Sequence, residues 1–451
     1  MSTEGAALAP ALLTRMVGAA AALFQDIQRT GPPIPDGPVL VAANHANALL
    51  DPLVLFRAAG RPTRPLAKAP LFRHPLVGPF LKGLGGLPVY RRQDDPALLE
   101  RNQDTFDAAV AALHRGEAVQ IYPEGTSHSE PALAPLKTGA ARIALLAEER
   151  AGWELGLVIV PVGLTYQRKH VFRGRAVVAV GEAIRVTAWR ERYETDPTVA
   201  VVALTDAVRA GLEAVMLNFV EAGDRELVEV AEALHSRATG AAAWTTRPGL
   251  VERWPRLRAF TEGLAWLRAH DPERHRRLVR RVDRYARVAA LLGAGEWGVP
   301  RRYQPTTVAL HALRQLALLA LLTPPALVGA VAWFLPYRVP TLVVHFARPS
   351  FDSVASYKLS AAMLAFPVFL VLWIALAWTW GGPAWGAFAG LAAVLGGLAW
   401  IPWRSRLRDL GDDARGFVRS LPRGHSRARL AALRDELARE FDEVASLANL
   451  S

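Results

Sequence analysis

Short apolar runs alternate with longer amphipathic stretches in the first part of the chain. Val39–Ala43 is typical of these runs, which have the length and composition of buried strands. The runs begin near Val39, Leu87, Val119, Val158 and Ala176. The amphipathic stretches between them have a helical period and begin near Leu49, Pro75, Ala97 and Gly139. This alternation predicts an α/β fold with a mostly parallel sheet and flanking helices.

Long apolar runs replace this alternation in the last third of the chain. Three of them, Leu316–Leu335, Ala361–Trp380 and Ala384–Ile401, contain no charged residue. At about 18 to 20 residues, each has the length that an α-helix needs to cross the ~30 Å hydrocarbon core of a bilayer. Because three such lengths seldom occur together in a soluble core, they predict a membrane-embedded region rather than buried soluble helices.

The first of these apolar runs is compatible with two membrane topologies. Pro324 and Pro325 interrupt it, which fits either a kinked span or a re-entrant or interfacial hairpin that returns to its own side. The positive-inside rule favours the second topology, because basic residues flank the runs on what would then be the cytoplasmic side. These residues are Arg301, Arg302, Arg314, Arg338, Arg348, Lys358, Arg404, Arg406, Arg408, Arg415 and Arg419. The two later runs, joined by Gly381–Pro383, predict a two-helix hairpin.

These patterns divide the chain into five parts. They are an amphipathic N-terminal helix (1–35), an α/β domain (36–190), a helical domain (191–305), a membrane-embedded region (306–403) and a basic, amphipathic helical tail (404–451). The first part has no secretory pattern, since Arg15 interrupts its apolar stretch, and we expect it at the membrane interface. Gly31–Pro38 ends this helix before the first strand. The tail helix, Ala428–Leu447, is expected to pair with a partner or with the helical domain.

The charge balance indicates what the chain contacts. The formal net charge is +12 at pH 7, and arginine supplies nearly all of it. Such basicity fits nucleic acid or anionic lipid. The apolar runs favour lipid, and we expect no nucleic-acid partner. The basic flanks predict an integral protein of the cytoplasmic (inner) membrane whose α/β domain faces the cytoplasm.

A histidine and an aspartate lie at the junction between the first apolar run and the next helical stretch. His45 follows the predicted strand Val39–Ala43, and Asp51 comes six residues later. On one ideal helix six residues would separate the two by roughly 120°, so the spacing places His45 in a turn before the helix. There Asp51 can fix the tautomer of an imidazole that acts as a general base. The alternative is an ordinary turn histidine and a helix-capping or surface aspartate.

Three further stretches follow this pair in order. Gly85–Arg92 combines a glycine turn, a short strand and two arginines, Ile121–Ser129 reads IYPEGTSHS, and Val158–Tyr166 is an apolar strand that carries a proline. Together with the stretch from His45 to Asp51, they resemble the four ordered motifs of the glycerolipid acyltransferase family. The resemblance implies the α/β fold of that family, with residues 36–190 as the catalytic domain, and acyl transfer to a glycerol-based acceptor.

The sequence departs from the commonest pattern of this family at two places. Five residues separate His45 from Asp51, where four are usual, and Ser127–His128 replaces the arginine that usually follows Glu-Gly-Thr. At both places the sequence resembles the branch of the family that contains glycerol-3-phosphate and dihydroxyacetone-phosphate acyltransferases. The stretches Lys68–Pro75, Val171–Arg175 and Val180–Glu182 are similar to that branch as well.

Two arginines of the second motif are the best-placed cations for a phosphorylated acceptor. Arg91 and Arg92 directly follow the predicted strand Leu87–Tyr90. Guanidinium groups suit phosphate oxygens because they donate several hydrogen bonds in one plane. The resemblance also implies that these two arginines bind the phosphate. The alternative is that they are ordinary solvated residues at the end of a strand.

The third motif and the lysine after it supply the remaining candidates. The resemblance implies that Glu124 and Gly125 bind the acceptor, and Gly125 also lets backbone N–H groups approach an anion closely. Lys137 corresponds to a lysine that often follows this motif. Since the usual arginine is missing, Lys137 and His128 are the candidates for its positive charge. The alternatives are a turn carboxylate at Glu124 and an ordinary surface histidine at His128.

The reaction expected from these parts is direct acyl transfer. No cysteine is present to form an acyl-enzyme. We therefore expect His45, oriented by Asp51, to deprotonate the acceptor hydroxyl, which attacks the thioester of acyl-CoA or acyl carrier protein. No cofactor or metal is expected. The partners are the acyl donor, a phosphorylated glycerol or lysolipid acceptor, and membrane lipids.

Three functions are consistent with the motifs. The first is acylation of glycerol-3-phosphate or 1-acylglycerol-3-phosphate in phospholipid synthesis. The second is remodelling of another lysolipid, which the missing arginine of the third motif leaves open. The third is a membrane adaptor without catalysis, which the intact His45, Asp51 and Glu124 disfavour.

Overall fold

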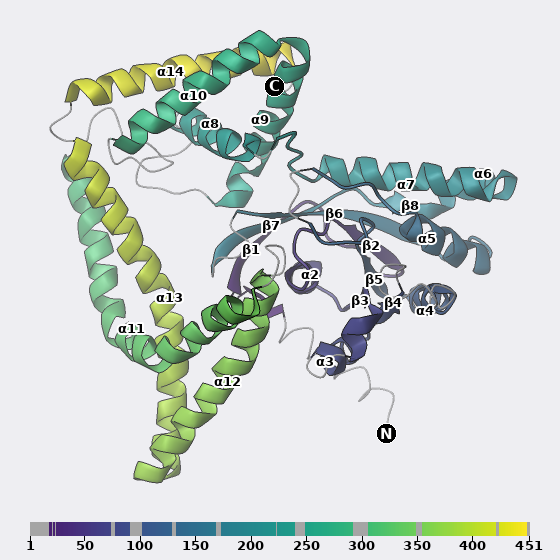
Figure 1. Ribbon diagram of the computed structural model, residues 1–451, viewed down its shortest axis with the longest axis horizontal. Helices are drawn as coiled ribbons and strands as arrows, with labels where there is room; N and C mark the ends of the chain where they lie inside the picture. Colours follow the sequence, from purple (N-terminus) through teal and green to yellow (C-terminus); the bar gives the residue numbers. More distant parts are fainter. Residues whose placement is uncertain are drawn as a thin grey trace. The chain divides into compact units, whose positions relative to one another are not determined.

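The chain forms two compact units, one built on a sheet and one helical (Figure 1). The computed structural model describes residues 18–19, 21–22, 24–73, 77–90, 102–128, 132–167, 173–221, 223–239, 249–291, 305–348, 354–420 and 424–448. Unit 1 contains residues 1–218 and 349–356, and unit 2 contains residues 219–348 and 357–451.

One mixed sheet forms the centre of unit 1. Its strands are β1 (Gln25–Thr30), β2 (Val39–Ala43), β3 (Thr63–Lys68), β4 (Leu87–Val89), β5 (Ala118–Ile121), β6 (Val158–Tyr166), β7 (Gly174–Val180) and β8 (Ile184–Arg185). Their order is β1-β7-β6-β2-β5-β3-β4, with β8 beside β6. All pairs are parallel except those that β6 forms with β7 and β8. The predicted α/β fold with a mostly parallel sheet is confirmed.

Two strands of this sheet differ from the sequence prediction. The helix expected within residues 1–35 is wrong for Gln25–Thr30, which forms β1 and pairs in parallel with β7. Because β7 lies far along the chain, the polar sequence QDIQRT of β1 gives no local sign of this pairing. Strand β3 was not predicted either, since Arg64 and Pro65 interrupt its apolar run.

Helices enclose the sheet of unit 1. They are α2 (Leu50–Ala59), α3 (Val77–Gly83), α4 (Asn102–His114), α5 (Gly139–Arg150), α6 (Arg190–Thr195) and α7 (Pro197–Ala214), with 3₁₀ turns η1 (Ala69–Arg73) and η3 (Val186–Trp189). One apolar core joins Leu40 of β2 to Leu113 of α4, Ile143 of α5 and Leu204 of α7. Because α7 belongs to this core, unit 1 extends to residue 218, beyond the expected boundary at 190.

Helix α2 is enclosed on nearly all sides. It begins at Leu50 and ends at Gly60, whose φ of 72° provides a left-handed cap. Asp51, in its first turn, is fully buried, as are Leu53 and Leu55. A helix that is apolar on most faces is held inside a core, so the start of α2 is a fixed platform for Asp51.

Four helices of unit 2 form a bundle with its own core. They are α8 (Asp224–Ala238), α9 (Leu250–His270), α10 (Pro272–Leu291) and α14 (Gly424–Leu447). Leu234, Leu267, Leu278 and Phe441 are members of this core. The C-terminal helix therefore pairs with the helical domain of its own chain, which is one of the two alternatives that the sequence left open.

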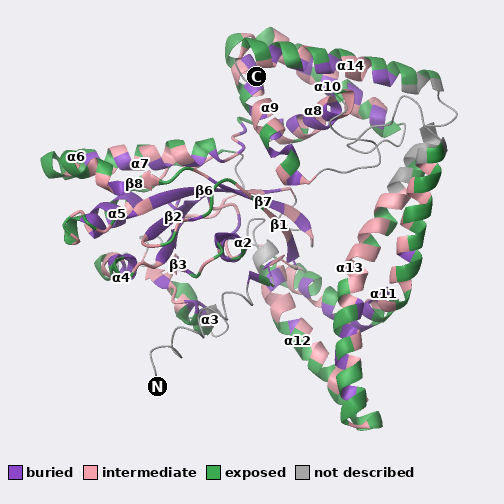
Figure 2. Ribbon diagram, turned by 180° about the vertical axis from the view of Figure 1, so that it is seen from behind, coloured by how far each residue is buried: buried purple, intermediate pink, exposed green. Residues whose placement is uncertain are grey.

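Three long apolar helices complete unit 2, except for the first three residues of α12, which belong to unit 1. They are α11 (Pro305–Ala347), α12 (Val354–Gly381) and α13 (Pro383–Ser420). The segments Val308–Ala347, Tyr357–Gly381 and Pro383–Gly411 are long and apolar enough to cross a membrane, with mean hydropathies of 2.0, 2.4 and 1.7. Much of their surface is exposed (Figure 2). Long helices that expose apolar side chains indicate a membrane protein.

Helices α11 and α13 are longer than their apolar runs. Pro324 and Pro325 do not end α11, which continues to Ala347. Helix α13 runs beyond the apolar residues to Ser420, so the first part of the expected basic tail continues this helix. Figure 1 shows α11 and α13 side by side and α11 bent into two arms.

Candidate active site

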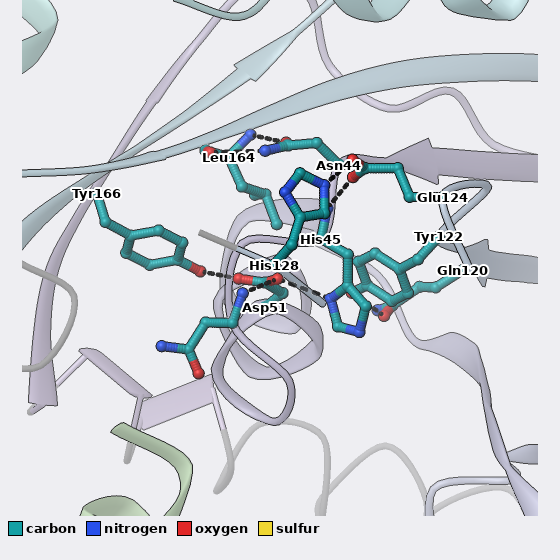
Figure 3. Close-up of polar contacts among 10 residues, drawn as sticks. Asn44, His45, Asp51, Gln120, Tyr122, Glu124, His128, Leu164 and Tyr166 are labelled. Carbon is teal, nitrogen blue, oxygen red and sulfur yellow. Dashed lines mark hydrogen bonds and ion pairs between the residues drawn. The ribbon is translucent and has the colours of Figure 1, made fainter. Parts of the chain in front are cut away.

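The predicted motifs meet at one edge of the sheet. Strands β2, β5 and β6 are mutually parallel neighbours, so their carboxyl ends share this edge. His45 follows β2, Glu124 follows β5, and Tyr166 ends β6. Figure 3 shows Tyr166 and the ring of His45 both directed toward Asp51, and Glu124 directed toward His128. The sheet thus brings the first, third and fourth motifs into one site.

His45 and Asp51 form a hydrogen-bonded pair. His45 lies in the turn between β2 and α2, as the six-residue spacing predicted. Its Nδ1 is 2.8 Å from Asp51 Oδ2, and the two side chains are 13% and 0% exposed. With Nδ1 bound to the carboxylate, Nε2 is the ring nitrogen left to exchange a proton. In Figure 3 this second nitrogen points away from Asp51.

Asp51 is held by two further donors. The backbone N–H of Asn47 donates to Oδ2 over 2.7 Å, and the hydroxyl of Tyr166 donates to Oδ1 over 2.6 Å. Burial and the nearby charge of Asp51 raise the pKa of Tyr166 well above its ordinary value, so its hydroxyl keeps the proton that it donates. A buried carboxylate is stable only when its oxygens are hydrogen-bonded. These bonds fix the orientation of Asp51.

The ring of Tyr122 packs against the imidazole of His45. The two ring centroids are 4.3 Å apart with an interplanar angle of 24°. Tyr122 is buried, and that burial, together with the charge of Asp51, raises the pKa of its phenol well above the ordinary value. The stacked ring and Asp51 hold the imidazole from two directions.

Glu124 connects the third motif to the first. Its Oε1 accepts the backbone N–H of His45 over 2.6 Å, and its Oε2 accepts that of Ala134 over 2.9 Å and also contacts Nε2 of His128. In return, the N–H of His128 donates to the carbonyl oxygen of His45 over 3.0 Å. The carboxylate is buried. These bonds attach both backbone polar groups of His45 to the loop of the third motif.

Gly125 and Lys137 lie against each other. Gly125 has a φ of +74°, and an added Cβ would come within 2.7 Å of Lys137 Nζ. The N–H of Lys137 donates to the carbonyl oxygen of Pro123 over 2.8 Å, which holds its backbone beside the third motif. Lys137 is exposed, so its ammonium is available to solvent at this edge.

Arg91 and Arg92 lie outside the described residues. Strand β4, which precedes them, ends at Val89 and is parallel to β3. Strand β3 is in turn parallel to β5, so β4 ends at the edge that holds His45.

Among the residues that the structure describes, no three His, Asp or Glu side chains are grouped closely enough to hold a metal ion.

Sequence reasoning missed three residues that organise the site. Two of them are Tyr166, which binds Asp51, and Tyr122, which stacks on His45. The third is Asn44: its Oδ1 accepts the backbone N–H of Leu164 in β6 over 2.6 Å, and its Nδ2 donates to the Leu164 carbonyl oxygen over 3.1 Å. Asn44 thereby ties the end of β2 to β6. The only sequence signal was position, since Asn44 precedes His45 and the two tyrosines end apolar strands.

Part of the sheet unit is similar to a known family. The Acyltransferase family model matches residues 26–165. Glycerol-3-phosphate O-acyltransferase 2 of Saccharomyces cerevisiae is 34% identical over 135 residues, which are 30% of this chain and 18% of that protein. Glycerol-3-phosphate O-acyltransferase 1 of the same yeast is 36% identical over 110 residues, 24% of this chain and 14% of that protein.

Two further matches cover more of the chain. An uncharacterized acyltransferase of Schizosaccharomyces pombe is 25% identical over an alignment of 280 residues, 43% of this chain and 41% of that protein. The crystal structure of the 1-acyl-sn-glycerophosphate (LPA) acyltransferase PlsC from Thermotoga maritima matches with a TM-score of 0.33 and 18% identity, over 45% of this chain and 78% of that one. The matched part spans less than half the length of each of these yeast proteins.

Proposed function

We propose, from the match of residues 26–165 to the Acyltransferase family model, that the chain transfers a fatty acyl group from a thioester to a hydroxyl of a phosphorylated glycerol. The observation that carries the proposal is the pair His45 and Asp51. Its carboxylate is buried and bound by three donors, while its imidazole is partly exposed at the sheet edge. This is the arrangement that a general base requires.

The proposed reaction is a direct attack. Nε2 of His45 accepts the proton of the acceptor hydroxyl, and the hydroxyl oxygen forms a bond to the thioester carbonyl carbon. The tetrahedral intermediate then collapses, the carbon–sulfur bond breaks, and the leaving thiolate takes the proton from the imidazolium. Asp51 stabilises the imidazolium between these two steps. An ester and a free thiol are the products.

Basic residues of the second and third motifs, with the lysine that follows them, are proposed to bind the phosphate of the acceptor. Lys137 lies against Gly125, the residue that follows Glu124, and its side chain is exposed to solvent. Arg91 and Arg92 follow the strand that ends at the same edge. His128 contacts Glu124 and is proposed to assist them. Ammonium and guanidinium groups together bind a dianionic phosphate more tightly than one cation can.

Glu124 is proposed to act on the acceptor through the backbone of the site. Both of its carboxylate oxygens already accept backbone N–H groups, one from His45 and one from Ala134. Its role in acceptor binding is therefore to hold the loop around Gly125 next to the base. Gly125, with its positive φ, lets the loop come close to an anion.

Glycerol-3-phosphate is the acceptor that we propose first. The two yeast proteins that share 34% and 36% identity with this chain are both called glycerol-3-phosphate O-acyltransferases. Acyl-CoA or acyl carrier protein is the proposed donor. The three apolar helices support a position in a membrane, and we propose the cytoplasmic membrane with unit 1 facing the cytoplasm.

A thiol-release assay tests this proposal. The chain contains no cysteine, so a thiol-reactive dye reports only the thiol set free from the donor. The purified full chain in lipid nanodiscs is given acyl-CoA with glycerol-3-phosphate, dihydroxyacetone phosphate, 1-acylglycerol-3-phosphate or lysophosphatidylcholine. We expect fastest release with glycerol-3-phosphate. A preference for lysophosphatidylcholine would instead support lysolipid remodelling.

The variant His45→Ala tests the base in the same assay. We expect its turnover to fall about 10²- to 10⁴-fold, the usual contribution of general base catalysis. His270→Ala is the matched control, because His270 lies in unit 2, where its Nδ1 bonds the carbonyl oxygen of Trp266 in its own helix. Equal activity of His45→Ala and wild type would overturn the proposed base.

A further inference from the structure

The contacts among α11, α12 and α13 define how deep each helix reaches. Helix α11 first runs antiparallel to α13: Trp403 Nε1 donates to Thr323 Oγ1 over 2.9 Å, and Trp333 Nε1 donates to the Ala393 carbonyl oxygen over 2.8 Å. The two contacts are ten residues apart along each helix, from Thr323 to Trp333 in α11 and from Trp403 back to Ala393 in α13. The two helices keep one register over this stretch.

The closest approach lies in the middle of this stretch. A Cβ added to Gly329 would lie 2.1 Å from the carbonyl oxygen of Gly396, and one added to Gly396 would lie 2.6 Å from the Gly329 nitrogen. Only glycine permits backbones to come this close in a membrane helix pair. The register between Thr323 and Trp333 is therefore fixed by packing as well as by hydrogen bonds.

The register ends after Trp333. A straight continuation of α11 would place Tyr337 beside Ala389, which is 15 residues, or roughly 22 Å, from Arg404 along α13. Instead Arg404 donates to the Tyr337 hydroxyl over 3.4 Å, and its guanidinium lies 5.6 Å from the centre of that ring. Two side chains cannot span the straight-helix distance, so α11 turns back toward the Arg404 end of α13, as the bend in Figure 1 shows.

A proline explains the position of the turn. Pro336 has no N–H, so the carbonyl oxygen of Ala332, four residues earlier, has no partner within the helix. Trp373 of α12 fills this position, because its Nε1 donates to the Ala332 carbonyl oxygen over 3.0 Å. The ring of Trp333 also stacks on Phe366 of α12 at 5.0 Å. The turn therefore packs against α12.

The tryptophans of α13 indicate where this helix meets the two borders of the bilayer core. Trp385 is exposed near the start of the helix, and Trp400 stacks on Trp403 farther along. From Trp385 to Trp403 the helix rises roughly 27 Å, close to the ~30 Å of a bilayer core whose two borders attract tryptophan. Ala393, the partner of Trp333, lies near the middle of this distance.

We propose that α11 is a re-entrant helix: it enters the bilayer beside α13, turns at Pro336 near mid-depth, and returns to the side from which it came. Only α12 and α13 cross. The surface that contacts lipid is therefore asymmetric, with three helices in one leaflet and two in the other. The ends of α11, the start of α12 and the charged end of α13 lie on one side, and only the turn at Gly381–Pro383 reaches the other.

Single cysteines test this topology in a chain that has none of its own. The matched substitutions are Ala309→Cys, Ala347→Cys, Ala384→Cys and Ala414→Cys, all at exposed alanines. Full-length variants in sealed membrane vesicles of each orientation are treated with an impermeant maleimide. We expect positions 309, 347 and 414 to react from one side and position 384 from the other. Reaction of all four in detergent is the control for reactivity.

Each other pattern overturns the proposal. If α11 crossed the bilayer, Ala309→Cys and Ala384→Cys would react from one side, and Ala347→Cys and Ala414→Cys from the other. Reaction of all four variants from one side, or protection of Ala384→Cys from both, would mean that α12 and α13 do not cross. The test uses no activity measurement, so its result is independent of the proposed reaction.

Discussion

The hydroxyl of Tyr166 donates a 2.6 Å hydrogen bond to Asp51 Oδ1, while the other oxygen of Asp51 binds Nδ1 of His45 at 2.8 Å. Tyr166 is 4% exposed and ends β6, whereas Asp51 lies in the first turn of α2. The sheet therefore fixes the carboxylate through the oxygen that does not bind the imidazole. Tyr166 is a positioning residue for the proposed base.

Replacing Tyr166 with phenylalanine removes this one hydrogen bond and keeps the ring. We expect kcat to fall about tenfold to a hundredfold, because a hydrogen bond to a charged group contributes about 1.5–3 kcal/mol. KM for the acceptor should stay unchanged, since Tyr166 acts through Asp51. The control is Tyr193→Phe, which removes a hydroxyl bonded to Glu149 at the surface of the same unit. Steady-state kinetics that move KM and leave kcat alone would contradict this role.

Asp51→Asn keeps the shape of the side chain but removes its charge. The amide cannot stabilise an imidazolium, and its NH₂ group competes with the His45 Nδ1–H and the Asn47 N–H for the same place. By analogy with other aspartate-oriented histidines, we expect kcat to fall about 10⁴-fold. Circular dichroism should show a folded protein. Activity within a factor of about ten of wild type would show that Asp51 does not assist the proposed base.

Gly125→Ala tests the place of Lys137 in phosphate binding. The added methyl group would meet Lys137 Nζ at 2.7 Å and displace the flexible side chain. We expect KM for the phosphorylated acceptor to rise about three- to tenfold. Gly116→Ala is the matched control, because Gly116 has the same φ of +74° and nothing within 4 Å of an added Cβ. Equal KM values for the two variants would show that backbone strain alone is responsible.

Local sequence was sufficient for the centre of the site and insufficient for its supports. The spacing of His45 and Asp51 predicted both the turn and their pairing, because strand, turn and helix follow one another within a few residues. The bond of Asn44 to Leu164 and that of Tyr166 to Asp51 join residues more than a hundred positions apart. Such partners become neighbours only when β2 and β6 pair, which no local pattern encodes.

The same limit applies to the folds of the two units. Apolar runs predicted β2, β4, β5, β6 and β7, but β1 depends on its distant partner β7. In unit 2, composition predicted the three apolar helices, whereas Pro324 and Pro325 left two topologies open and the structure continues α11 through both prolines. Within a membrane a helix tolerates proline when neighbouring groups replace the lost hydrogen bonds.

Trp373→Phe removes the donor that replaces such a bond. The Ala332 carbonyl oxygen would be left without the Nε1 partner that it has at 3.0 Å. We expect unit 2 to lose about 1 kcal/mol of stability, seen as a lower thermal unfolding temperature of the chain in nanodiscs. Trp378→Phe, at a position 55% exposed on the same helix, is the control and should change stability little.

A double-mutant cycle with Pro336→Ala shows whether the proline creates the need for Trp373. In Pro336→Ala the new backbone N–H can bond the Ala332 carbonyl oxygen within α11. Trp373→Phe should then cost less in the Pro336→Ala background than in the wild-type background, with a coupling of about 0.5–1 kcal/mol. The unfolding temperatures of the four proteins give this coupling. The same loss in both backgrounds would mean that Trp373 stabilises α12 by packing alone, because the orphaned carbonyl would then have no part in its effect.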